Sequence, residues 1–209
     1  MHTIDKTRDS NSPSFDDMEA LLAGAPIVTQ DLPGHTRAAV ALVVGRNRDG
    51  YRILFIERAA HPDDPWSGNI GFPGGKVEEG DDGCRRTAER ETLEEVGLDL
   101  SGARYLGRLS DVHGAHLPVL VSCFVYGVDR IDGPLTLSDE VKDAFWVSLD
   151  DLGDPRRQGV HHFDFAGDRF QGPCIDLPVA DKPVLWGLTH RLVMEFLRIL
   201  GLQRGGGGP

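Results

Sequence analysis

The sequence predicts an α/β protein of the α+β type, in which a mixed β-sheet is sandwiched between helices. Apolar runs rich in β-branched residues recur between glycine- and aspartate-containing turns, and only two or three helical patterns interrupt them. The length of 209 residues suits one main domain. A hydrophobic content of 40% and a charged content of 26% are those of an ordinary globular protein.

The two ends of the chain differ in composition from the middle. Residues 1–34 form an N-terminal extension whose first part is polar, without the apolar stretch of a secretory signal. Within it, Ser14 is a candidate N-cap for a short helix at 15–23. We expect the folded domain to span 35–200 and the glycine-rich residues 201–209 to form a flexible tail.

The first part of the domain contains a hairpin signal and then a long loop. Two apolar runs, 38–44 and 51–56, flank a segment that ends in Asp49-Gly50, which predicts a β-hairpin. Residues 62–83 are rich in glycine and proline. A stretch of that length is too long for a simple connection, and it favours a functional loop.

Helical signals follow at two places. One helix is expected at about 83–96, ended by Gly97 as a C-cap. Another is expected at 183–200, where apolar residues recur at helical spacing. The remaining strand-like runs are 103–109, 119–128, 141–147, 160–165 and 169–177.

Charge and cysteine content narrow the function classes. With 22 Lys+Arg against 33 Asp+Glu, the net charge is −11, which argues against a nucleic-acid or anionic-membrane partner. A phosphate ligand would need a local cation. The three cysteines are widely spaced and odd in number, so we expect reduced thiols and a cytoplasmic protein. The apolar run 184–200 carries too many charges to span a bilayer.

Three carboxylates on the expected helix point to a metal ion. At about 100° per residue, Glu91, Glu94 and Glu95 fall on one face, where they would repel one another. A divalent cation would remove that conflict, and Mg²⁺ prefers carboxylate oxygens and shares substrate phosphates. The alternative is a solvated acidic face. The glycines at Gly74 and Gly75 favour the metal site, since they let the backbone approach a ligand or cation.

At this point the residues resemble a known family. Gly75, Arg90-Glu91 and the run 94–98 are similar to the Nudix box of Nudix hydrolases, and the resemblance extends over about 37–200. The spacing in the box is one residue longer than usual, and an aspartate stands where a glutamate is common. The longer spacing and Phe-Pro-Gly-Gly at 72–75 resemble the branch of coenzyme A pyrophosphatases. The resemblance implies a Nudix-like mixed β-sheet sandwiched between helices.

The resemblance also implies roles for individual residues. Glu91, Glu94 and Glu95 match metal-binding carboxylates, Gly75 matches a glycine whose carbonyl completes the metal shell, and Arg90 matches the arginine that orients the carboxylates. The alternative for Arg90 is a surface ion pair with Glu94. The expected cofactor is Mg²⁺, for which Mn²⁺ can substitute.

The implied reaction is hydrolysis of a nucleoside diphosphate linked to another group. A general base must take a proton from the attacking water. Glu94 and Glu95 are candidates, although each is also a candidate metal ligand. Glu140 is a separate candidate, in a loop just before a strand, and the alternative is an ordinary loop acid.

Candidate substrate contacts lie around the long loop. Arg58 ends a strand and could bind a phosphate through a bidentate contact of its guanidinium group. Gly74 lets the backbone approach a ligand, and Lys76 could touch a phosphate, although a solvated lysine is the alternative. Trp66 could stack on a base or pack in the core, whereas Phe72 is expected in the core.

Coenzyme A or a derivative is the first substrate hypothesis. The second is ADP-ribose or a nucleotide sugar, because residues 59–67 lack the additional arginine usual in the coenzyme A branch. A non-enzyme alternative is a Nudix-like domain that senses a nucleotide without cleaving it. The intact set of box glutamates and the lack of a fused effector module favour the enzyme. Exposed strand edges would allow a homodimer.

Overall fold

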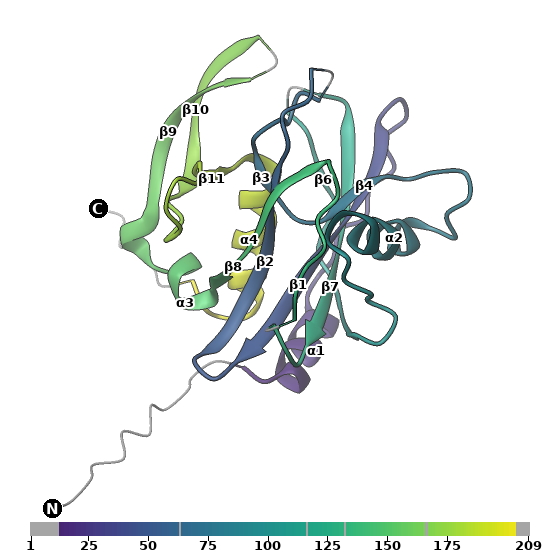
Figure 1. Cartoon of the computed structure of the whole chain (residues 1–209), viewed down its shortest axis with the longest axis vertical. Coiled ribbons are helices and arrows are strands. Elements are labelled where there is room, and N and C mark those ends of the chain that lie inside the picture. Colours follow the sequence, from purple (N-terminus) through teal and green to yellow (C-terminus); the bar gives the residue numbers. More distant parts are fainter. Residues whose placement is uncertain (1–12, 63, 116, 132, 166, 204–209) are drawn as a thin grey trace, which may run out of the picture.

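The computed structural model describes residues 13–203 except 63, 116, 132 and 166. A large mixed sheet occupies the centre (Figure 1). Helix α2 (Cys84–Val96) covers one side of it. Helix α4 (Gly187–Ile199) lies on the other side, where it packs against a smaller sheet. The expected class, a mixed sheet sandwiched between helices, is confirmed.

Five strands of the large sheet are hydrogen-bonded side by side in one continuous order. Their spatial order is β3 (Ile70–Gly71), β2 (Gly50–Arg58), β1 (Thr36–Asn47), β7 (Val119–Val128) and β5 (Arg104–Arg108). Three further strands pair at the sides of this path: β4 (Gly74–Lys76) with β1, β6 (Val112–His113) with β7, and β8 (Val141–Ser148) with β2. Strands β1 and β7 run parallel, which makes the sheet mixed.

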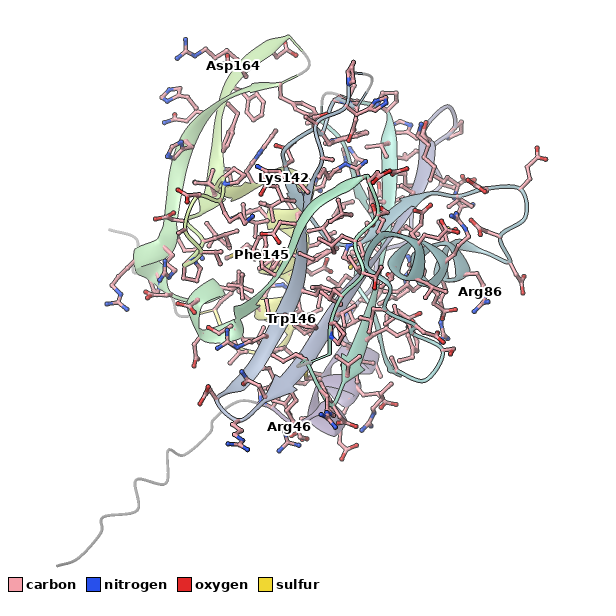
Figure 2. The ribbon with its side chains drawn as sticks, viewed as in Figure 1. Arg46, Arg86, Lys142, Phe145, Trp146 and Asp164 are labelled. Carbon is pink, nitrogen blue, oxygen red and sulfur yellow. The ribbon has the colours of Figure 1, made fainter. Side chains whose placement is uncertain are left out.

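Strand β1 is buried on both faces because it lies between the two helical layers. Leu42 and Val44 pack into the cluster that contains α4, and Ala41 and Val43 pack into the cluster that contains α2. This explains why its sequence is a nearly continuous apolar run rather than an alternating one. Side chains fill the space between the layers (Figure 2).

The local signals at turns and helix ends predicted these elements correctly. The β1–β2 hairpin is present, with Asn47 paired to Gly50. Helix α2 ends at Gly97, whose φ of 68° is the left-handed conformation that favours glycine. Helix α1 (Phe15–Gly24) is capped by Ser14 as expected. The extension and tail assigned to 1–34 and 201–209 lie partly outside the described residues.

The expectation of one helix over 183–200 was wrong at its start. Leu185 and Trp186 form a short strand, β11, that pairs with β10 (Asp168–Ile175), and the helix begins only at Gly187. Strand β9 (Gln158–Phe165) completes the smaller sheet. The short helix α3 (Leu149–Leu152) and the 3₁₀ turn at Pro155–Arg157 were not expected either.

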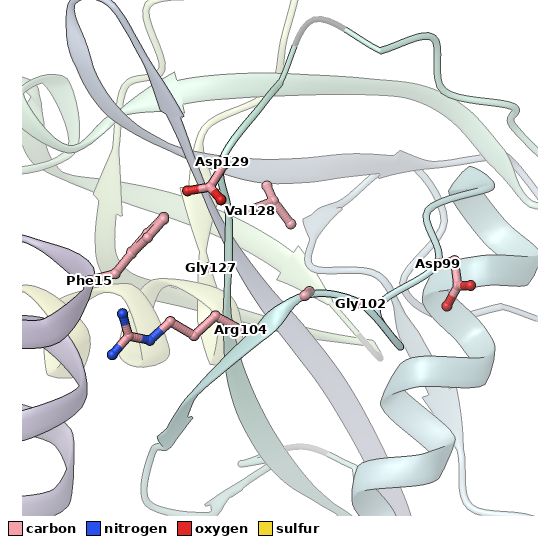
Figure 3. Close-up of a pocket in the computed structure, with 8 residues that line it drawn as sticks. Phe15, Asp99, Gly102, Arg104, Gly127, Val128 and Asp129 are labelled. Carbon is pink, nitrogen blue, oxygen red and sulfur yellow. The ribbon is translucent and has the colours of Figure 1, made fainter.

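Two hollows lie near α1. One, of about 340 Å³, is lined by residues that include Phe15, Arg104 and Asp129 (Figure 3). Arg104, which lines this hollow, already forms ion pairs with the carboxylates of Asp16 and Glu19. The other, of about 500 Å³, lies between α1 and β5. Neither is lined by a carboxylate of α2. Across the described residues, no helix has the length and apolar character needed to cross a membrane.

Candidate active site

The three glutamates of α2 differ sharply in burial. Glu95 is 3% exposed, Glu91 is half-buried, and the side chain of Glu94 is 58% exposed. Glu91 lies between the other two on the helical wheel, so this gradient follows from the direction in which α2 faces the sheet. The acidic face therefore runs from the protein interior to solvent, rather than being uniformly solvated.

Glu95 is held by the glycine loop and by Arg58. The backbone N–H of Gly74 donates to Glu95 Oε2 at 2.8 Å, and Arg58 Nη1 lies 3.7 Å from Glu95 Oε1. Burial raises the pKa of Glu95 to about 7, even though the Gly74 hydrogen bond and the Arg58 charge act in the opposite direction. This carboxyl therefore changes its charge near neutral pH.

Gly75 leaves room for the carboxylate of Glu91. A Cβ at position 75 would lie only 2.4 Å from Glu91 Oε1 and 2.8 Å from Oε2, so any larger residue would displace that side chain. Burial raises the pKa of Glu91, and repulsion from Glu94 and Glu140 adds to the rise. Gly74 is equally constrained, because its φ is 154° and a Cβ there would lie 2.3 Å from the carbonyl oxygen of Ala39.

Arg90 contacts two carboxylates of the acidic face and is itself bound by Asp81. Arg90 Nη1 donates to Glu91 Oε1 at 2.9 Å and to Glu94 Oε2 at 3.0 Å, while its Nε donates to Asp81 Oδ1 at 3.0 Å. The hydrogen bond from Arg90 lowers the pKa of Asp81 well below its usual range, and Thr87 also donates to this carboxylate. The Glu94 pair considered as an alternative role for Arg90 is present together with these other contacts.

Sequence reasoning missed Asp81 as the anchor of Arg90. Its only signal was the aspartate at the place where a glutamate is common. Asp64 was missed in the same way: Arg58 Nε donates to Asp64 Oδ2 at 2.7 Å. Arg58 thus lies between Glu95 and Asp64, and this contact reduces the positive charge that Arg58 can offer to a ligand.

Glu140 and Lys76 lie at the margin of this cluster. Glu140 is exposed in the turn before β8, and its carbonyl accepts from the N–H of Ala59, next to Arg58. Its charge raises the pKa of both Glu91 and Glu95, so the structure brings it toward the box carboxylates. The side chain of Lys76 is exposed. Phe72 is buried and stacks on Phe55, which confirms the expected core position.

The described residues contain no group of three or more histidine, cysteine, aspartate or glutamate side chains arranged to hold a metal ion. Within the described residues, Arg90 contacts Glu91 and Glu94, and Arg58 contacts Glu95. The donor set nevertheless fits a divalent cation. Its carboxylates raise one another's pKa, which marks an excess of negative charge, and Gly75 keeps the space beside Glu91 open.

Comparison with known proteins identifies the family. The model of the NUDIX domain matches residues 35–166, which is more than half of the chain. The chain belongs to the Nudix family. The mitochondrial coenzyme A diphosphatase of Homo sapiens is 32% identical over 86% of this chain and 75% of its own length. An uncharacterized protein of Schizosaccharomyces pombe is 35% identical over 71% of this chain, and the chain spans only 56% of that protein.

A solved structure of the same family shares the fold. The MutT/nudix family protein from Enterococcus faecalis has a TM-score of 0.53 and 16% identity, covering 90% of this chain and 70% of that one. These findings confirm the expected family and fold, and they support the expected class of pyrophosphohydrolase. The roles of individual residues, the homodimer and the cytoplasmic location stay predictions, and the human relative is named as mitochondrial.

Proposed function

We propose that this Nudix chain is a divalent-metal-dependent pyrophosphohydrolase that cleaves the diphosphate bridge of a nucleoside diphosphate linked to another group, with coenzyme A or a derivative as the first candidate. The observation that carries the proposal is the buried Glu95 carboxylate, which accepts from Gly74, faces Arg58 and lies beside Glu91. The human relative's name supports coenzyme A.

Glu91, Glu94, Glu95 and the Gly75 carbonyl would hold Mg²⁺, with Mn²⁺ as a substitute. Such a cation neutralises the negative charge of the diphosphate and polarises its phosphorus. Arg90, fixed by Asp81, keeps Glu91 and Glu94 oriented toward this point. The glycine loop lets the backbone come close to the bound ligand. Arg58 and Lys76 supply positive charge for its phosphates.

The general base is one of three carboxylates. Glu95 lies at the buried end of the acidic face, where it accepts from Gly74 and faces Arg58, and it is a candidate base as well as a candidate metal ligand. Glu94 and Glu140 are exposed and remain candidates with access to a solvent molecule. Replacing each of them by glutamine and comparing kcat values assigns the role.

A second substrate class is favoured by one contact. Asp64 binds Arg58 at 2.7 Å, and this acidic partner disfavours the extra phosphate of coenzyme A. ADP-ribose or a nucleotide sugar carries less negative charge.

Incubation of the protein with coenzyme A, ADP-ribose and UDP-glucose, each with Mg²⁺ or Mn²⁺, tests the proposal. Release of 4′-phosphopantetheine with adenosine 3′,5′-bisphosphate supports the first class, and release of AMP with ribose 5-phosphate supports the second. Tight binding without any turnover would instead support a nucleotide sensor.

A further inference from the structure

Aromatic side chains from separate segments gather beside the loop that carries Asp64. We call this set the aromatic wall: Trp66, Phe163, Phe165, Phe170 and Trp186. Trp186 stacks on Phe163 with ring centroids 4.4 Å apart and an angle of 17°, and Phe165 meets Trp186 edge-on at 5.3 Å. All five side chains are half-buried, so the wall is neither sealed in the core nor fully solvated.

The aromatic wall is joined to the candidate active site through one carboxylate. Asp64 accepts from Arg58 Nε at Oδ2 and from the backbone N–H of Trp66 at Oδ1, at 2.7 and 3.0 Å. Arg58 in turn faces Glu95. On the other side of the loop, Trp186 Nε1 donates to the Asn69 side chain at 3.3 Å, while the Asn69 carbonyl accepts from the backbone N–H of Arg58. The side chain of Asp64 therefore lies between the aromatic wall and Arg58, the residue that is expected to contact the phosphates.

The spacing of the rings changes at the end of the wall nearest Arg58. Trp66 and Phe165 have centroids 6.4 Å apart with a 40° angle between their planes, wider than the stack of Phe163 on Trp186. Carbon atoms in contact lie about 3.5–4.0 Å apart, so two planes about 7 Å apart admit one planar ring between them. The Trp66 and Phe165 rings would therefore have to turn parallel and separate slightly to hold a flat ligand between them.

We propose that Trp66 and Phe165 bind the base of the substrate's nucleoside half, a planar heteroaromatic ring, while the diphosphate lies against Arg58 and the acidic face of α2. In a nucleotide the base is separated from the diphosphate by a single ribose, which matches a wall that starts one contact beyond Arg58. This inference rests on the proposed function, because it takes the position of the diphosphate from it. Aromatic side chains stack on any base, so the wall favours nucleosides over base-free diphosphates.

The test uses two non-hydrolysable ligands that differ in the base. Calorimetry measures the binding of α,β-methylene-ADP and of methylenediphosphonate, each with Mg²⁺, to the wild-type chain and to Trp66→Leu. The expected result is a loss of about tenfold or more in affinity for α,β-methylene-ADP, with methylenediphosphonate changed less than about twofold. Trp66→Phe keeps a ring and should restore most of the affinity. Phe165→Leu should resemble Trp66→Leu.

Trp146→Leu is the matched control. Trp146 lies on β8 (Figure 2), where it packs against the cluster on the α2 side of the sheet. This variant should bind both ligands as the wild type does, and thermal melting checks that each variant is folded.

Several outcomes overturn the inference. An equal loss for both ligands in Trp66→Leu would show that the residue acts only through Asp64 and Arg58. No loss for either ligand would remove the wall from recognition. A third ligand, 4′-phosphopantetheine, is measured in the same way, and a loss for it but not for α,β-methylene-ADP would assign the wall to the other half of the substrate. Because binding needs no turnover, a base-dependent result can stand even if the proposed hydrolysis fails, and hydrolysis can stand if the base has no effect.

Discussion

Replacing Glu95 by glutamine should abolish most activity and stabilise the metal-free protein. Glutamine keeps the shape of the side chain and an oxygen that can accept from the Gly74 N–H, but it removes the negative charge. Loss of a charged group at the reaction centre typically costs about a hundredfold in kcat. Replacing a residue that only packs in the core would lower the free energy of unfolding instead of raising it. A loss of activity together with a gain in stability therefore distinguishes a functional carboxylate from a structural one.

The stability effect can be worked out from the pKa. The pKa of Glu95 rises from 4.5 to about 7 in the folded protein, and its side chain is only 4% exposed. The stability that the bound proton contributes is fully present below pH 4.5 and is lost as the pH rises through about 7. A shift of this size corresponds to about 3 kcal/mol. The unfolding free energy of the variant, relative to wild type, should therefore increase by about 3 kcal/mol between pH 4.5 and pH 8.

Urea denaturation in EDTA at a series of pH values measures this difference, because the chelator removes any divalent cation that would compensate the charge. Steady-state hydrolysis of the best substrate, with Mg²⁺ added, measures kcat. Near-normal turnover in Glu95→Gln would remove Glu95 from the catalytic set. A variant that is less stable than wild type at pH 8 would refute the assignment of a buried, uncompensated carboxylate.

Two further substitutions test other contacts. Gly75→Ala should lower kcat by about tenfold or more by displacing Glu91, whereas Gly80→Ala, whose new Cβ meets nothing within 4 Å, should not; equal activities would contradict the close approach. Lys182→Met should destabilise the fold by about 1–3 kcal/mol in urea denaturation, because Glu57 is 3% exposed and would lose one of its two lysine partners, at 2.8 Å, while keeping Lys142 at 2.6 Å. A cost below about 1 kcal/mol would show that the pair is effectively solvated.

The elements that could be predicted from sequence are those with local signals. The β1–β2 hairpin and α2 followed from turn and capping residues, since Asp49-Gly50 and Gly97 act within a few residues of their own position. The strands β3, β4 and β11 were missed because each has two or three residues and is defined only by its partner. Trp186 was assigned to a helix for this reason, although its backbone pairs with Cys174.

The candidate site, like the fold, could be predicted where local periodicity defines it. The helical period brought Glu91, Glu94 and Glu95 to one face without any knowledge of the fold. It could not show that Glu95 is buried while Glu94 is exposed, because that depends on how α2 packs against the sheet. The partners Asp64 and Asp81 come from the long loop, whose path is set by tertiary contacts rather than by local periodicity.

The account depends on the acidic face of α2 holding a divalent cation together with a diphosphate. Electron paramagnetic resonance of Mn²⁺, titrated into the chain with α,β-methylene-ADP present, detects such binding as a loss of the free-ion signal beyond the loss that the analogue causes without protein. We expect stoichiometric loss of that signal with the wild-type chain and a much weaker loss with Glu91→Gln. A loss no greater with the wild-type chain than with the analogue alone, at millimolar Mn²⁺, or equal binding by both chains, would contradict the account.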